Sequence, residues 1–235
     1  VYVWIDALTN YITGLGYDLD GNSDPKFKEF WPADIHIVGK DIIRFHIIYW
    51  PIMLMALGLP LPKKIYGHGW LLQNGEKMSK SKGNVLYFDD LADVFGVDAV
   101  RYYVLSEMGL ADDGMVGWDL ITDRTNTDLA NIYGNLVSRT IAMSNKYFGG
   151  VVKNGGVKTE VDDSLIEVVT GAYDKVCKKM DDLKIADALS EIFAVFKRAN
   201  KYIDETEPWK LAKDESQKAR LETVLYNLTE TIIIG

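Results

Sequence analysis

Ile35-His36-Ile37-Val38-Gly39-Lys40-Asp41-Ile42 places a short buried strand, a glycine turn and the start of a helix next to one another. The β-branched residues of Ile35–Val38 favour a strand, and Gly39 favours a turn. Asp41 is a good N-cap for a helix that is apolar almost all round from Ile42 to Leu57. Strands that alternate with helices favour a parallel, doubly wound α/β sheet.

A ligand site is expected at the carboxyl end of this strand. In open α/β sheets, ligands lie beyond that end, and the N–H groups of a helix start favour negative charge. Gly39 lets a ligand approach the backbone. The local pattern leaves two roles open for Asp41: capping the helix or accepting hydrogen bonds from ribose hydroxyls. His46 shares a helix face with Ile42, but a lone histidine in an apolar run is more often a satisfied core residue.

Further short elements surround this unit. The apolar run Val1–Ile5 is predicted to be a buried strand, followed by a short helix in Asp6–Gly14. Ile65–Gly67 begins another strand. Gly69–Met78 is predicted to be a hairpin, because Asn74-Gly75 is a strong two-residue turn signal.

Directly after this hairpin comes Lys77-Met78-Ser79-Lys80-Ser81, which continues into Lys82-Gly83-Asn84-Val85. A short lysine run is usually a solvated surface loop. Two lysines three residues apart on a loop rich in small residues also suit a polyphosphate whose charge changes during a reaction. Lysine is a compact charge on a flexible stem, so it can follow a moving phosphate.

The second half of the chain has a helical period from about Asp119 onward. One buried stripe recurs at spacings of three and four, in Leu129, Ile132, Leu136, Thr140, Met143 and Tyr147. Further helices are expected at Asp89–Phe95, Asp98–Met108, Leu165–Met180, Ile185–Ile203 and Gln217–Ile234. The pattern predicts a helical bundle after the α/β half, with domains at residues 1–117 and 118–235. The boundary is expected near Ala111–Trp118, where Asp112–Gly117 forms a turn-rich connector.

Composition limits the classes of function. The chain has 235 residues, 48% of them hydrophobic, and a net charge of −8. An acidic chain is unsuited to coating nucleic acid indiscriminately, although a local face can still recognise RNA. The only cysteine, Cys177, excludes an internal disulfide and a multi-cysteine zinc site, and it favours a cytoplasmic setting. No apolar run reaches the roughly 18–20 residues that cross a membrane.

The order and spacing of several motifs resemble the bacterial type of methionyl-tRNA synthetase. K-M-S-K-S is the signature loop of class I aminoacyl-tRNA synthetases, and alone it admits the leucyl, isoleucyl, valyl or cysteinyl enzymes. The strings that narrow the resemblance to methionine are Trp4-Ile5-Asp6-Ala7-Leu8-Thr9-Asn10-Tyr11, Gly39-Lys40-Asp41-Ile42 with Phe45-His46, and Gly67-His68-Gly69-Trp70. The resemblance covers essentially the whole chain.

The resemblance implies the C-terminal part of a Rossmann-like class I catalytic domain, followed by a helical-bundle anticodon-binding domain. It implies a methionine pocket formed by Trp4, Ala7, Leu8, Tyr11, Ile42 and His46. A polarizable, unbranched thioether suits such aromatic and aliphatic walls. Without the resemblance, plain core packing would be the better interpretation of Trp4 and Tyr11.

The same resemblance implies a nucleotide site, in which ATP is a substrate and Mg²⁺ accompanies the triphosphate. Its residues are Gly39, Asp41, His68, Lys77 and Lys80, with Lys77 and Lys80 as the catalytic pair. Lys80 is expected to contribute more to the transition state than Lys77. His68 equally fits a purely structural role. No carboxylate cluster in the sequence identifies metal ligands.

An anticodon site is implied at Asn135, Arg139 and Trp209. Asn135 and Arg139 are four apart and share one helix face, and Trp209 stands where an exposed ring could stack on an unpaired base. The alternatives are a solvated polar face for the first two and burial in the bundle for Trp209. The implied partners are methionine, ATP and the initiator and elongator methionine tRNAs, with no membrane and an oligomeric state that the sequence leaves open.

Both ends of the chain are expected to be cut from a longer protein. The H-I-G-H signature and the zinc-bearing connective domain are missing, and both are expected upstream of Val1. The isolated chain is therefore expected to be inactive. The rival interpretations are another class I synthetase for an apolar amino acid, a non-catalytic RNA-binding module, and a nucleotidyltransferase that binds no RNA.

Overall fold

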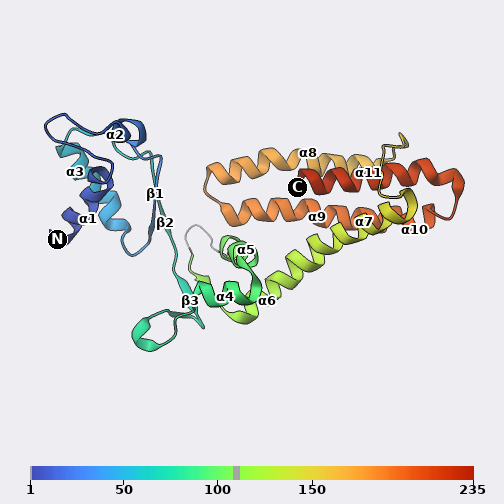
Figure 1. Ribbon diagram of the computed structural model, residues 1–235, viewed down its shortest axis with the longest axis horizontal. Coiled ribbons are helices and arrows are strands. Elements are labelled where there is room, and N and C mark those ends of the chain that lie inside the picture. Colours follow the sequence, from blue (N-terminus) through green and yellow to red (C-terminus); the bar gives the residue numbers. More distant parts are fainter. Residues whose placement is uncertain (1, 108–111) are drawn as a thin grey trace. The chain divides into compact units, whose positions relative to one another are not determined.

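The computed structural model describes residues 2–107 and 112–235 (Figure 1). These residues form two compact units. The first contains the described part of residues 1–71 and 110–114, and the second the described part of residues 72–109 and 115–235. The predicted domain boundary at 117/118 remains a prediction. Met108, the end of one predicted helix, and Ala111, the first residue of the range predicted for the boundary, lie outside the described residues.

The first unit pairs a short parallel sheet with helices. Its elements are α1 (Tyr2–Thr13), α2 (Pro25–Phe30), β1 (Ile35–Gly39), the π-helix η1 (Phe45–Tyr49), α3 (Trp50–Ala56) and β2 (Lys64–His68). β1 and β2 are parallel, and their register runs from Ile35 opposite Lys64 to Gly39 opposite His68. The predicted parallel pairing and the strand–turn–helix unit are confirmed.

The predicted strand at Val1–Ile5 is wrong for its described residues, which form the first turns of α1. Val1 lies outside the described residues. Trp4, Leu8 and Ile12 recur four residues apart, and both Leu8 and Ile12 are only 1% exposed. Periodicity within a short apolar run cannot distinguish a strand from a helix, because the residues that reveal the helical spacing lie further along the chain.

The predicted helix Ile42–Leu57 is a composite of η1 and α3. The Trp50 N–H bonds to the Phe45 carbonyl, five residues back, and this wider turn ends where Pro51 enters α3. Proline has no N–H to continue the ladder. Trp50 and Leu54 are fully buried and join Leu8, Ile12, Phe27 and Trp31 in the core of this unit.

The predicted hairpin consists of β3 (Leu71–Gln73) and β4 (Glu76–Lys77), and this prediction is confirmed. All of it except Leu71 belongs to the second unit. Asn74 and Gly75 form the turn, with φ of 52° and 80°. These positive angles suit asparagine and glycine. β5 (Gly114–Met115) lies on the other side of β3, so the strand order is β4-β3-β5.

Helices make up the rest of this unit. They are η2 (Lys80–Lys82, a 3₁₀ turn), α4 (Phe88–Phe95), α5 (Val97–Glu107), α6 (Trp118–Arg124), the π-helix η3 (Thr125–Gly134), α7 (Asn135–Phe148), α8 (Glu160–Asp181), α9 (Ile185–Thr206), α10 (Pro208–Leu211), the 3₁₀ turn η4 (Glu215–Gln217) and α11 (Lys218–Ile234). Figure 1 shows α7, α8, α9 and α11 as the long helices of a bundle. The predicted stripe packs as expected: Leu136 and Thr140 are buried, and Leu129, Ile132, Met143 and Tyr147 pack against the core.

A buried polar cluster ties the loop before α8 to this bundle. Arg220 donates to both oxygens of Asp162, at 2.9 and 2.7 Å, and Tyr202 donates to Oδ1. The backbone N–H and hydroxyl of Thr159 donate to Oδ2 at 2.7 and 2.8 Å, and Asn227 donates to Oδ1 at 3.0 Å. We call these five residues the Asp162 cluster. Its hydrogen bonds compensate the cost of burying a charge.

Candidate active site and RNA-binding face

α1, η1 and α3 enclose an apolar pocket of about 360 Å³ in the first unit. Trp4 and Leu8 line it, together with Phe45, Tyr49 and Met53. The rings of Trp4 and Phe45 stack with 3.9 Å between their centroids and 10° between their planes. Two of the predicted methionine-pocket residues therefore meet in one cavity, with a ring stack and an aliphatic side chain in its lining.

Tyr11, Ile42 and His46 are joined by hydrogen bonds next to this pocket. The Nδ1 atom of His46 lies 3.0 Å from the Ile42 carbonyl, and Nε2 lies 2.9 Å from the Tyr11 hydroxyl. Because a carbonyl only accepts, Nδ1 carries a proton, and in the neutral imidazole the Tyr11 hydroxyl donates to Nε2. His46 is buried, and its ring lies edge-on to Trp4 at 6.4 Å. Ala7 is exposed on α1.

The structure adds a buried histidine, His36, that the sequence argument did not assign. Its ring lies 4.5 Å from that of Tyr11, and its Nε2 accepts a hydrogen bond of 3.2 Å from the Trp50 indole. Burial lowers the pKa of His36, and the proximity of His46 lowers it further. The available signal was alternation along β1, where His36 and Val38 point inward and Ile37 is 67% exposed. Because apolar residues flank His36 on both sides, this alternation is not visible in the sequence.

Gly39, Asp41 and His68 come together at the carboxyl ends of β1 and β2. A Cβ atom on Gly39 would lie 2.6 Å from Asp41 Oδ1 and 3.9 Å from His68 Cε1. Only glycine fits there without displacing the Asp41 carboxylate. The Nδ1 atom of His68 lies 2.8 Å from the Gly69 carbonyl, so Nδ1 carries a proton. Asp41 is exposed and can accept hydrogen bonds from a ligand.

The lysine loop, residues 77–84, lies in the second unit and is closed by Asn84. Asn84 accepts from the Ser79 N–H at 2.8 Å and donates to the Lys77 carbonyl at 3.3 Å. Lys77 and Lys80 are both exposed. Lys82 donates to Glu76 at 3.2 Å, whereas Lys80 forms no ion pair with any described residue. The Lys80 ammonium is therefore available to an anionic ligand.

Arg139 lies on α7 and Trp209 lies on the short helix α10. Arg139 on α7 lies 3.5 Å from the carboxylate of Asp204 near the end of α9. Glu207 then adopts a left-handed conformation with φ of 44°. The short helix α10 follows, and its first two residues are Pro208, which is buried, and Trp209. Trp209 is 39% exposed, so burial in the bundle does not describe it. Asn135 is exposed at the start of α7, one turn before Arg139.

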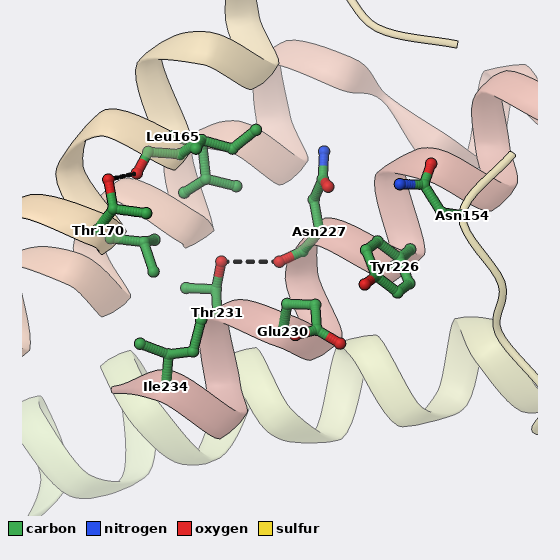
Figure 2. A pocket seen from close by; sticks show the side chains of 10 residues that line it. Asn154, Leu165, Thr170, Tyr226, Asn227, Glu230, Thr231 and Ile234 are labelled. Carbon is green, nitrogen blue, oxygen red and sulfur yellow. Dashed lines mark hydrogen bonds between the residues drawn. The ribbon is translucent and has the colours of Figure 1, made fainter. Parts of the chain in front are cut away.

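Another pocket, of about 210 Å³, lies between α8 and α11 (Figure 2). Its labelled polar residues are largely engaged within the fold: Thr231 donates to the Asn227 carbonyl at 2.7 Å, and the side chain of Asn227 belongs to the Asp162 cluster. None of the predicted site residues lines it.

Comparison with known proteins identifies the family. A family model described as "tRNA synthetases class I (M)" matches residues 1–141. The chain belongs to the methionyl-tRNA synthetase family. A second model, described as "Anticodon binding domain of methionyl tRNA ligase", matches residues 152–231. The methionyl-tRNA synthetase resemblance, and the succession of a catalytic-domain part and an anticodon-binding part, are confirmed.

Relatives and solved structures agree with this assignment. A methionine–tRNA ligase of Clostridium perfringens is 58% identical over 99% of this chain, and one of Caldanaerobacter subterraneus is 56% identical over the same share. The chain spans 36% of the length of each of these curated relatives. The structure of Mycobacterium tuberculosis methionyl-tRNA synthetase in complex with methionyl-adenylate matches with a TM-score of 0.92 and 43% identity, over 99% of this chain and 46% of that one.

Two features are absent from the described residues, 2–107 and 112–235. None of their helices is both long and apolar enough to span a membrane. They also contain no group of three His, Cys, Asp or Glu side chains arranged to hold a metal ion.

Proposed function

We propose that this chain is part of a methionine–tRNA ligase that activates methionine with ATP and transfers it to the 3′ end of methionine tRNA. The observation that carries the proposal is the pocket of Trp4 and Leu8 beside the Tyr11–His46 hydrogen bond, in a chain of this family. The pocket offers stacked rings and aliphatic walls to an unbranched thioether. Ile42 fixes the His46 tautomer through its carbonyl.

In the first step, the methionine carboxylate attacks the α-phosphate of ATP, and pyrophosphate leaves with its electron pair. No covalent intermediate with the protein is required, because positioning and charge stabilisation suffice. We assign Asp41 and Gly39 to the ribose, His68 to the adenine side and Lys77 with Lys80 to the triphosphate. The exposed Lys80 ammonium without an ion-pair partner among the described residues suits the developing charge. Mg²⁺ is proposed to accompany the triphosphate.

In the second step, a tRNA hydroxyl attacks the methionyl carbonyl of the adenylate and releases AMP. We propose that Asn135, Arg139 and Trp209 read the anticodon of initiator and elongator methionine tRNAs. An exposed indole can stack on an unpaired base, and the amide and guanidinium groups can recognise base edges. The proposed compartment is the cytoplasm, in keeping with the single cysteine.

The test is ATP–pyrophosphate exchange by the full-length protein, with methionine compared against leucine, isoleucine, valine and cysteine. Exchange that depends on methionine supports the proposal. Exchange that prefers another amino acid assigns the protein to a different class I specificity, and tRNA binding without any exchange leaves an RNA-binding module. The isolated 235-residue chain is the control and is expected to be inactive.

A further inference from the structure

Lys40 follows Gly39 directly, at the mouth of the proposed nucleotide site. A lysine in this position would ordinarily be assigned to a phosphate group. In this structure the Lys40 ammonium instead contacts other residues of the protein. The Lys40 ammonium donates to Asp113 and lies 4.4 Å from the centroid of the Trp70 ring. Among the described residues, this lysine therefore contacts a carboxylate 73 residues further along the chain and an aromatic face.

Asp113 connects the two halves of this contact. Its Oδ1 also accepts the backbone N–H of Trp70 at 2.9 Å. The hydrogen bond from Lys40, followed by that from the Trp70 N–H, holds the pKa of the Asp113 carboxyl below its ordinary value of 3.8. One carboxylate thus fixes the lysine side chain and the Trp70 backbone together.

Backbone contacts hold the same segment. The Gly114 N–H bonds to the Trp70 carbonyl at 2.8 Å, and the Lys40 N–H bonds to the His68 carbonyl at 2.9 Å. A Cβ on Gly69 would lie 2.1 Å from the Asp112 carbonyl oxygen, so the two backbones touch where glycine alone fits. His68–Trp70 is therefore enclosed between Lys40 and residues 112–114.

We propose that Lys40 is a positioning residue for ATP and not a phosphate ligand: with Asp113 it fastens residues 112–114 onto Trp70 and fixes His68 at the nucleotide site. The inference rests on the proposed function. Because Lys40 acts through Asp113, losing either partner releases the same segment. The consequence falls on ATP, since the apolar cavity proposed for methionine is lined from α1, η1 and α3 and by none of these residues.

The test uses the full-length protein and steady-state pyrophosphate exchange, with KM measured separately for ATP and methionine. The variants are Lys40→Met, Asp113→Asn, the double variant and the conservative Lys40→Arg. Each single variant is expected to raise the KM for ATP about three- to tenfold, with kcat and the KM for methionine nearly unchanged. The double variant should be no worse than either single one, and Lys40→Arg should stay close to wild type.

A matched control is Lys63→Met, which removes another lysine–aspartate pair of the same unit, formed with Asp34. It should leave all three constants unchanged. Thermal unfolding of every variant separates a loss of fold from a loss of positioning.

Asp113→Asn decides between the two roles of Lys40. If Lys40 binds phosphate, freeing it from Asp113 leaves the KM for ATP unchanged or lowers it, and that result overturns the proposal. Equal changes in both KM values, or a lower unfolding temperature with unchanged KM values, also overturn it. A wild-type protein without methionine-dependent exchange overturns the proposed function and this inference together, whereas an active wild type with an unaffected Asp113→Asn overturns the inference alone.

Discussion

Asp162 in the helical bundle and Lys80 in the loop after β4 both carry a charge, yet their surroundings are opposite. Asp162 is fully buried, and Arg220, Tyr202, Thr159 and Asn227 all donate to it. Lys80 is exposed and forms no ion pair with any described residue. A buried charge must be satisfied by its own fold. A charge that is to meet a ligand has to remain available.

This difference separates a charge that the fold itself satisfies from a charge that we propose meets a ligand. Neutralising the Asp162 cluster should affect stability and leave chemistry alone, whereas neutralising Lys80 should do the reverse. The comparison fails wherever one substitution produces both effects.

The largest expected effect is that of Asp162→Ala. It removes the acceptor for Arg220, Tyr202 and Asn227 and leaves a guanidinium buried without its partner. The free energy of unfolding should fall by about 3–5 kcal/mol. Equilibrium denaturation measures this. Asp163→Ala is the control, because Asp163 is exposed and pairs with Lys158 at the surface, and it should change stability by less than about 1 kcal/mol.

Lys80→Ala should lower kcat for pyrophosphate exchange about 10²- to 10³-fold in the full-length protein, because one donor to the developing charge is lost. Its unfolding temperature should not change. Lys82→Ala is the matched control within the same loop, since Lys82 is already paired with Glu76. A similar loss of rate in both variants would mean that general positive charge, and not Lys80 itself, drives the step.

Features that depend on local sequence signals could be predicted, whereas contacts between residues far apart in the sequence could not. Asn74-Gly75 predicted the hairpin, and the three–four spacing around Leu136 predicted the buried face of α7, because both depend on neighbours along the chain. The pairing of Arg220 with Asp162 spans 58 residues. No local pattern reports such a contact, and Lys40 with Asp113 was missed for the same reason.

The sites divide in the same way. Tyr11 and His46 came from a motif, and the structure brings them within a hydrogen bond of each other. The tautomer of His46 depends on its contact with the Ile42 carbonyl, which only the folded structure reveals. The start of α1 was predicted to be a strand because the helical spacing of Trp4 becomes visible only with Leu8 and Ile12, one and two turns later.

Trp209→Ala should weaken binding of the anticodon stem-loop by about 1–3 kcal/mol through the loss of one stacking partner. Fluorescence anisotropy of a labelled stem-loop, with the full-length protein, measures this. Trp118 is a close match for exposure, at 40% against 39%, and it lies on α6, where its ring contacts that of Phe95. Trp118→Ala should leave binding unchanged. Equal losses in both variants would contradict a specific stacking role for Trp209.

The smallest expected effect is the acid response of the Asp162 cluster. Burial alone raises the pKa of Asp162, but hydrogen bonds from Tyr202, Arg220 and Thr159 outweigh it and hold that pKa below 3.8. A group whose pKa is depressed by folding stabilises the protein above its unfolded pKa and loses that contribution as pH falls through the folded pKa. The difference in unfolding free energy between wild type and Asp162→Ala should therefore stay constant from pH 7 to about pH 5. Below about pH 4 it should shrink by at most about 1.4 kcal/mol per pH unit. If this difference grows as the solution becomes more acidic, Asp162 is protonated in the folded protein. Asp162 would then carry no charge to compare with that of Lys80.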